Sequence, residues 1–206
     1  IAMAYTLFQG GSSLQVMDTA GALTTLTLPS GITVDSTKTP RMTVFGRYAV
    51  VTNSVNRPIT VDPEFTVRVL TPNPPRTRPV LTNTNGGTLS GTYQIKQTFV
   101  TLDEYQQIIN ESDYGEEALA FAITTDYLTA TELDQSSDDV TRSRLYRTAT
   151  LGTTYFRWLD LDGNTQTSVS DDLADASLET QASPLLGTPP VLTMVATYRD
   201  RLWGVG

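Results

Sequence analysis

Residues 86–100 read Gly-Gly-Thr-Leu-Ser-Gly-Thr-Tyr-Gln-Ile-Lys-Gln-Thr-Phe-Val, a glycine-rich turn followed directly by an alternating segment. Tyr93, Ile95 and Phe99 fall on one face of an extended chain, and mostly polar side chains fall on the other. A period of two predicts a half-buried β-strand. The glycines do not form a phosphate-binding loop, because no Gly-Lys-Ser/Thr follows and the next element is a strand. We therefore expect this strand to organise a small β-domain.

Composition favours an all-β protein. Only 17% of the 206 residues are charged, and 14 Gly and 11 Pro supply many turns. The chain has no cysteine and no histidine. A disulfide framework, a zinc finger, a thiol nucleophile and histidine-based catalysis are therefore excluded.

The net charge of −8 is unevenly distributed. Residues 1–100 carry eight Lys/Arg against four Asp/Glu, and residues 101–206 carry six against eighteen. The acidic half repels phosphate and the other half lacks a basic cluster, so sequence-specific nucleic-acid binding is not expected. We also expect no membrane span, since no apolar run reaches about 20 residues. The first residues lack the pattern of a signal peptide, and both ends look cut from a longer chain.

Residues 1–71 predict β-hairpins. Apolar runs at 14–17 and 23–28 flank an Asp-Thr-Ala-Gly turn, and runs at 42–45 and 48–51 flank Gly46-Arg47. Residues 59–70 are interrupted by Pro63 and predict an edge segment. Residues 72–79 hold four prolines, which favours a stiff linker.

Residues 80–181 predict an immunoglobulin-like or fibronectin type III-like sandwich, because about seven short strands alternate with turn residues. Within it we expect a helical turn at 105–109 and two separate strands at 118–124 and 127–133. We also expect a hairpin turn at Asp162-Gly163 that leads into residues 165–169. Residues 171–178 predict one helical turn or a capping loop.

Residues 182–190 predict a second linker, and residues 191–206 predict a terminal β-hairpin that pairs with the first region. This hairpin echoes residues 42–51, because in both an apolar strand precedes a short Arg-containing turn and a second apolar strand. The sandwich therefore reads as an insertion between repeats of a larger β-array.

Two groups of residues and the C-terminal strand carry a resemblance to a known family. They are Gly91-Thr92-Tyr93 with Thr98-Phe99-Val100, Arg144-Leu145-Tyr146-Arg147-Thr148, and Tyr198-Arg199-Asp200-Arg201-Leu202-Trp203-Gly204. Together they resemble structural proteins of tailed bacteriophages, in which a β-propeller carries an inserted fibronectin-like module. This resemblance covers roughly residues 86–206, and the chain is too short for a complete propeller.

The resemblance implies a virion structural protein of the tail nozzle or adaptor type, located in the viral tail or at the head–tail connection. It implies a homo-oligomeric ring that contacts other virion proteins, such as tail, adaptor and portal proteins, while DNA passes through it non-specifically. It implies neither enzymatic activity nor a cofactor. The alternative is a fibronectin-like or carbohydrate-binding adhesion module of a secreted or surface protein.

Aromatic and basic residues are the candidate interface. Tyr155 and Trp158 lie on one predicted strand and Trp203 on the last, where they could contact another subunit or stack on a sugar. Arg142, Arg144 and Arg147 share another strand. They could pair with acidic loops of the same domain or with those of a neighbouring copy.

Acidic residues supply the remaining candidates. Asp138, Asp139, Asp171 and Asp172 are candidate channel-lining acids, and solvated loop positions are the plain alternative. Paired carboxylates could also belong to a glycosidase fragment, if a cleft held them at a set separation. Residues 160–164 read Asp-Leu-Asp-Gly-Asn, which could begin a calcium loop or form the hairpin turn already expected.

Overall fold

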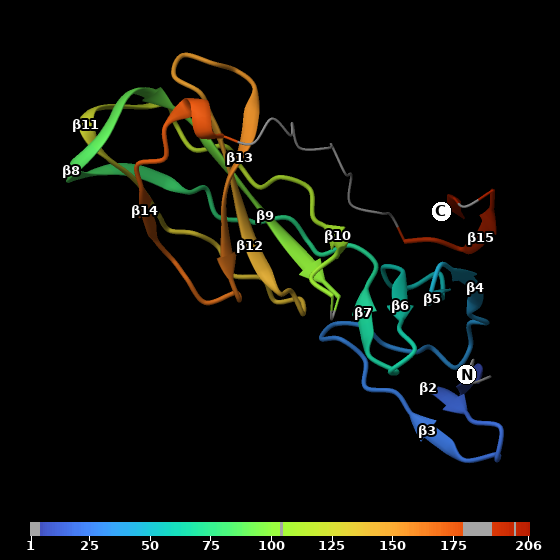
Figure 1. Cartoon of the computed structure of the whole chain (residues 1–206). Coiled ribbons are helices and arrows are strands. Elements are labelled where there is room, and N and C mark those ends of the chain that lie inside the picture. Colours follow the sequence, from blue (N-terminus) through green and yellow to red (C-terminus); the bar gives the residue numbers. More distant parts are fainter. Residues whose placement is uncertain (1–4, 104, 179–190, 200) are drawn as a thin grey trace. The chain divides into compact units, whose positions relative to one another are not determined.

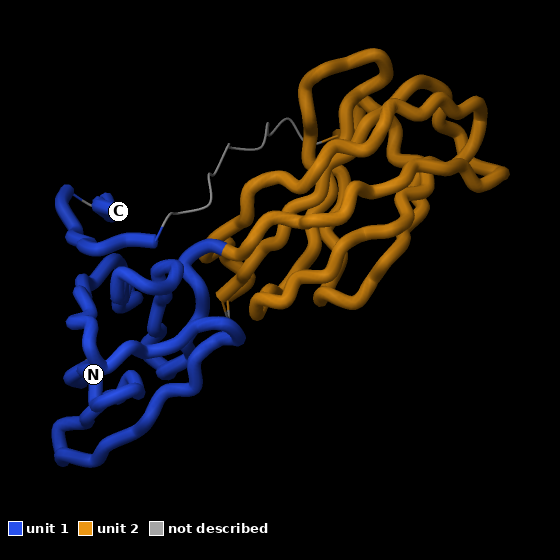
Figure 2. The backbone as a smooth tube through the Cα atoms, turned by 180° about the vertical axis from the view of Figure 1, so that it is seen from behind, with its two compact units in different colours: residues 1–71, 189–206 blue, residues 72–188 orange. Residues whose placement is uncertain are grey.

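In the computed structural model the chain is built from antiparallel β-sheets and divides into two units (Figures 1 and 2). The structure describes residues 5–103, 105–178, 191–199 and 201–206. Unit 1 comprises residues 1–71 and 189–206, and unit 2 comprises residues 72–188. The expected all-β class is confirmed. A single turn of 3₁₀ helix, η1 (Asp175–Ser177), is the one helical element in the described ranges, and none of their helices could cross a membrane.

The first sheet of unit 1 is a three-stranded meander. Its strands are β1 (Thr6–Gly10), β2 (Ser13–Met17) and β3 (Leu23–Thr25). The predicted hairpin is present between β2 and β3, where an Asp18 carboxylate oxygen accepts hydrogen bonds from the N–H groups of Ala20 and Ala22. This local hydrogen bonding closes the turn without help from the rest of the fold.

The second sheet of unit 1 is a four-stranded antiparallel meander. Its strands are β4 (Arg41–Phe45), β5 (Tyr48–Thr52), β6 (Ile59–Val61) and β7 (Val67–Val69), in that order across the sheet. The β4–β5 hairpin agrees with the sequence prediction. Residues 59–70 form two strands rather than one edge segment, because the chain turns at residues 62–66 and Asp62 caps that turn by accepting from Thr66 N–H.

Unit 1 stacks three sheets as layers. Leu14 and Val16 of β2 pack against Val51, Ile59 and Val61 of the second sheet in one core cluster. Val50 must face the other side of that sheet, since side chains alternate along a strand, and it has no exposed surface. The third layer lies on this side: β15 (Met194–Tyr198) and β16 (Arg201–Val205) form a hairpin.

Contacts from the third layer reach the middle sheet directly. The Thr197 hydroxyl donates to the Val44 carbonyl at 2.6 Å and lies 3.1 Å from the Thr43 hydroxyl. Elsewhere in this segment, the Leu192 carbonyl accepts from Ser54 N–H. The four-stranded meander of unit 1 is therefore packed against β1–β3 on one face, and β15 lies over β4 and β5 on the other. All of unit 2 separates β15 from these strands in the sequence.

Unit 2 contains two sheets that share one core. Strands β10 (Ile108–Glu111), β9 (Ile95–Leu102), β12 (Arg142–Thr148) and β13 (Tyr155–Asp162) form the first sheet, in that spatial order. Strands β14 (Val169–Asp171), β11 (Phe121–Thr131) and β8 (Val80–Tyr93) form the second. Both sheets contribute to one apolar cluster, with Leu128 and Tyr93 from one and Leu145 and Trp158 from the other.

The glycine-rich stretch differs from its prediction in two ways. Gly86 and Gly87 lie inside β8 rather than in a turn before it, at a bulge where four residues of β8 oppose Thr125 of β11. The chain then changes sheets at Gln94, since β8 pairs with β11 and β9 pairs with β12. Strand β9 is buried on both faces rather than half-buried.

Burial of β9 explains that second correction. Gln97 is fully buried and uses its side-chain amide to donate to the Asp134 carbonyl and accept from Asp134 N–H. Thr98, on the opposite face, is also buried and donates to the Glu111 carboxylate. Polar side chains therefore occupy buried positions because they are hydrogen-bonded, which the alternation of apolar and polar residues does not reveal.

Three further local predictions were wrong. Residues 105–109 do not form a helical turn: Gln106 N–H donates to the Asp103 carbonyl in a turn, and residues 108–111 form strand β10, which pairs with β9. The two strands predicted at 118–124 and 127–133 are one strand, residues 121–131. The irregularity at Thr125 is a bulge within this strand and does not end it. Asp162 and Gly163 do not make a hairpin turn, since the strand that follows, β14, joins β11 in the other sheet. The 3₁₀ turn η1 falls where one helical turn or a capping loop was expected.

The proline-rich segment is bound to unit 2 by its backbone. The Asn73 N–H donates to the Asp138 carboxylate at 2.8 Å, and the Arg76 N–H donates to the Asp134 carboxylate at 2.5 Å. The predicted linker at 182–190 lies outside the described residues.

Candidate functional site

The arginines of β12 form ion pairs within unit 2. Arg144 donates two hydrogen bonds to the Asp160 carboxylate of the neighbouring strand, from Nε at 2.7 Å and from Nη2 at 2.9 Å. Its Nη1 lies 3.3 Å from the Glu111 carboxylate. Arg144 and Asp160 are directly opposed in the β12–β13 register, so the strand pairing itself positions this fork.

Glu111 and Asp160 are the acidic centres of this network. Glu111 is buried and also accepts hydrogen bonds from the hydroxyls of Thr98 and Tyr146, both at 2.6 Å. Burial alone would raise the pKa of Asp160, but the hydrogen bonds and charge of Arg144, with a contribution from Arg157, hold it below its ordinary value. The network is a mutually neutralised set of charges with almost no solvent-facing surface at its centre.

Arg142 lies nearer the solvent. Its Nε is 3.0 Å from the Asp162 carboxylate, and its Nη2 donates to the Gln106 side chain at 2.9 Å. Arg142 and Arg144 thus both pair with residues of their own unit, which is the intramolecular alternative that the sequence left open.

Arg147 points into the core and has no exposed surface. Its Nη1 lies 2.6 Å from the Asp175 carboxylate, and its guanidinium donates to the carbonyls of Thr148 and Leu173. The guanidinium carbon lies 4.9 Å from the Tyr93 ring centre, a cation–π arrangement. Arg147 therefore holds the η1 segment to β12 and is not available to a partner.

The two tryptophans have opposite environments. Trp158 is buried, and its indole N–H donates to the Asp171 carboxylate at 2.9 Å. Trp203 is 56% exposed. Of the three aromatic interface candidates, Trp203 has the most exposed side chain and Tyr155 is half-buried.

Tyr155 belongs to an aromatic group at the surface of the four-stranded sheet. The Lys96 ammonium lies 4.5 Å from the Tyr155 ring centre and 5.2 Å from that of Tyr114. Burial, together with the smaller effect of the nearby charges of Glu111 and Asp113, raises the pKa of Tyr114 to about 12. These phenols remain protonated at neutral pH, so the group is a packed cation–aromatic cluster and offers no base.

The candidate channel-lining acids lie in different settings. Asp138 is buried and binds Asn73 N–H, and Asp171 accepts from Trp158 and from Leu173 N–H. Asp172 is half-buried with Thr88 as a donor, whereas Asp139 is exposed. Three of these four carboxylates therefore accept hydrogen bonds from their own unit.

In the possible calcium loop, two of the candidate ligand side chains already bind other groups of the protein. Asp160 is bound by arginines, and the Asn164 side chain exchanges hydrogen bonds with the backbone of Ser136. Within the described ranges, no group of three or more carboxylates is arranged to hold a metal ion.

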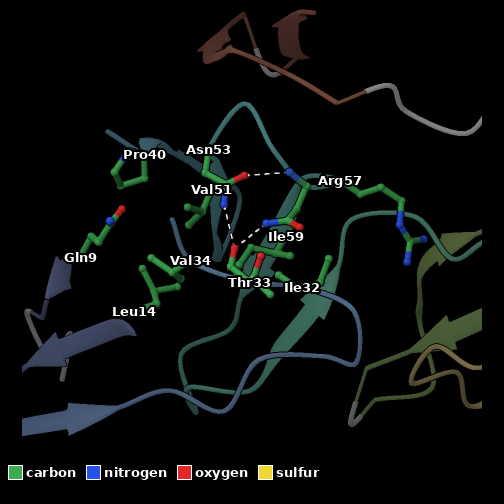
Figure 3. A pocket seen from close by; sticks show the side chains of 11 residues that line it. Gln9, Leu14, Ile32, Thr33, Val34, Pro40, Val51, Asn53, Arg57 and Ile59 are labelled. Atoms are coloured by element: carbon green, nitrogen blue, oxygen red, sulfur yellow. Dashed lines mark hydrogen bonds between the residues drawn. The ribbon is translucent and has the colours of Figure 1, made fainter. Parts of the chain in front are cut away.

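Two cavities lined by described residues are small. One in unit 1 has a volume of about 20 Å³, room for about one water molecule, and is lined mainly by apolar side chains such as Leu14, Val51 and Ile59 (Figure 3). Asn53 and Asn56 close one side by donating to the Thr33 carbonyl. A polar cavity of about 140 Å³ in unit 2 borders Asp134. Both fall below the roughly 300 Å³ of typical small-molecule sites.

The remaining candidate is an apolar sheet face in unit 1, which we call the hairpin face. Opposed residues of β15 and β16 share a face, so Met194, Tyr198, Trp203 and Val205 lie together. Each of these four side chains is 54–60% exposed. The opposite face of the hairpin bears Val195 and Thr197 and is turned toward the middle sheet. Such a contiguous exposed apolar face is typical of a contact surface.

The sequence analysis named Trp203 as an interface candidate but missed Met194, Tyr198 and Val205. An alternating pattern could have identified them, since apolar residues recur at every second position of 194–198 and 203–205. The comparisons with known proteins add no relative: no family model and no curated protein matches this chain.

Proposed function

We propose that the chain is a structural, non-enzymatic component of a tailed-phage virion. In this proposal unit 1 consists of propeller-blade-like sheets, and unit 2 is a fibronectin-like sandwich inserted between them. The protein acts by oligomeric assembly into part of a tail or head–tail ring of the nozzle or adaptor type. DNA then leaves through the ring without specific contacts.

The layered arrangement of unit 1 is the observation that carries the proposal. Propeller blades are four-stranded antiparallel sheets that stack face to face. Strands β4–β7 form such a meander, with β1–β3 packed on one face and β15–β16 on the other. The chain leaves unit 1 after β7 and returns to it at β15, which supports the proposal that unit 2 is an insertion between blade-like sheets.

Strand order in unit 2 supports the sandwich. In immunoglobulin-like domains one sheet has the order G-F-C-C′, and the other places B beside E and E beside D. The order β13-β12-β9-β10 matches the first if β9, β12 and β13 are C, F and G. The order β8-β11-β14 then matches B-E-D, except that the strand in the D position comes from the end of the unit.

Charge separation between the units is compatible with a passage for DNA. Unit 1 carries seven Lys/Arg against five Asp/Glu, whereas unit 2 carries seven against seventeen. An excess of carboxylates repels the phosphate backbone, so a passage lined by unit 2 would not retain DNA. This is a proposal about the lining, in which the exposed Asp139 would take part.

Particle composition tests the proposed function. Tailed particles produced by the genome that encodes this chain would be purified and analysed by quantitative mass spectrometry and electron cryomicroscopy. We expect several symmetric copies of the chain in the tail. A particle preparation that lacks the chain, or a chain found attached to a cell surface instead, would reject the proposal.

A further inference from the structure

Among the described residues, the sheets β15–β16 and β1–β3 each turn one face away from the middle sheet of unit 1. The hairpin face lies at one end. At the other end lies the outer face of β1–β3, which we call the meander face. The register places Met17 opposite Leu23, with Phe8 on the same side of the sheet. The polar side chains of Thr6, Gln15 and Thr25 share this side. Leu23 is 58% exposed, and none of the three apolar side chains belongs to the core between the first two layers.

The interior of unit 1 shows what covers such faces. One face of the β4–β7 sheet packs against β1–β3, with Val16 and Ile59 in the same core cluster. On the other face β15 lies over β4 and β5, with Thr197 against Thr43. The layers continue in one direction, so the hairpin face of one molecule and the meander face of another can extend the same stack. In repeat proteins an uncapped end surface of this kind promotes association.

Charge favours the same partner. Arg201 lies on the hairpin face, opposite Tyr198. Asp18 directly follows Met17 at the edge of the meander face. Pairing unlike faces brings these opposite charges to one contact, whereas pairing two hairpin faces brings arginine to arginine.

We propose that the hairpin face of one copy docks on the meander face of a second copy, so that the chains associate head to tail. This inference deepens the assembly role proposed above, because it names the partner and both surfaces. The contact is heterologous: each copy keeps one free face of each kind, and the association continues into a closed ring or an open filament.

The test uses the full chain and two single substitutions. Trp203→Glu places a charge on the hairpin face, and Leu23→Glu places one on the meander face. Leu119→Glu is the matched control, since Leu119 is an exposed leucine of unit 2. Mass would be measured by light scattering after size exclusion, and circular dichroism would confirm that each variant keeps the wild-type β-spectrum.

The expected pattern is specific to a head-to-tail contact. Wild type and the control associate with increasing concentration, and each face variant alone is monomeric. An equimolar mixture of the two face variants forms a dimer and nothing larger, because one intact pair of unlike faces remains. The dimer in the mixture also shows that both variants are folded.

Three results would overturn the inference. The first is a wild-type chain that stays monomeric up to about 1 mM, the weak end of specific association. The second is a mixture that stays monomeric although both variants keep the native spectrum. The third is association that is unchanged in Leu23→Glu. These outcomes are separate from the proposed function, because a chain found in virions could still be monomeric in solution, and a self-associating chain could be absent from them.

Discussion

Arg147 Nη1 lies 2.6 Å from Asp175 Oδ1, although the two residues belong to elements far apart in sequence and Arg147 has no exposed surface. Asp175 starts the 3₁₀ turn η1 and also accepts from Thr150 N–H. This ion pair ties the last described segment of unit 2 to the core strand β12. A buried cation depends strongly on its carboxylate, because losing the partner leaves an uncompensated charge in the interior.

Asp175→Ala should lower the free energy of unfolding by about 3 kcal/mol, the cost of breaking a buried pair. The matched control is Asp162→Ala, since Asp162 pairs with Arg142 but its side chain is 86% exposed. Exposed pairs contribute about 1 kcal/mol or less. Urea unfolding monitored by circular dichroism measures both changes. Equal losses in the two variants would contradict the role given to Arg147.

Acid should weaken unit 2 through Asp160. Its folded pKa lies below the ordinary value of 3.8, despite burial, because Arg144 and Arg157 bind the charged form. The stabilisation is therefore fully present above that ordinary value and is lost as pH falls through the lower folded pKa. We expect the urea midpoint to fall steeply below about pH 4 in wild type. The slope should be shallower in Asp160→Asn, and identical slopes would show that Asp160 does not couple folding to protons.

Gly87→Ala should destabilise unit 2 by about 2 kcal/mol or more, the cost typical of forcing atoms into a packed site. A Cβ at this position would lie 2.3 Å from the backbone carbonyl carbon of Asp126 on the neighbouring strand. Gly46→Ala is the control, because Gly46 lies in the turn between β4 and β5 and has open space around it. At Gly46 only the positive φ of 59° opposes the substitution. Thermal unfolding that ranks Gly46→Ala as the more damaging change would refute the close approach of β8 and β11.

The two tryptophans should be separable by fluorescence quenching. Trp203 is 56% exposed and Trp158 is 5% exposed. In Trp158→Phe the remaining emission should be red-shifted and readily quenched by acrylamide at protein concentrations where the chain is monomeric. In Trp203→Phe the remaining emission should be blue-shifted and resist quenching. Raising the concentration should protect Trp203 if the hairpin face is covered by a second copy, so the same signal reports on association.

Local features of the fold were readable from the sequence. The hairpins β2–β3, β4–β5 and β15–β16 follow turn residues that act over four to six positions, such as Asp18 with its own turn N–H groups. Side-chain alternation likewise locates strands. These signals are short-range, so they do not depend on the rest of the chain.

Long-range pairing was not readable. The turn residues at Asp162 and Gly163 predict a bend, but they do not specify that β14 joins β11 rather than β13. The partners of the arginines depend on the strand register. Arg144 pairs with Asp160 because the β12–β13 register places them opposite each other. Arg147 is three residues further along β12, so its side chain lies on the other face of the sheet. Nor could composition distinguish a buried Trp158 from an exposed Trp203. Each requires knowing which sheet covers which face.

The position of β15–β16 in the chain sets an order of events during synthesis. The face of the middle sheet that bears Val50 is covered by residues encoded after all of unit 2. A nascent chain on the ribosome therefore holds an open apolar sheet face while the whole of unit 2 is made. Domains generally fold as they emerge, so unit 2 can be complete before unit 1 closes. Strands β15 and β16 thus close unit 1 and also supply the hairpin face that we propose for contact with another copy.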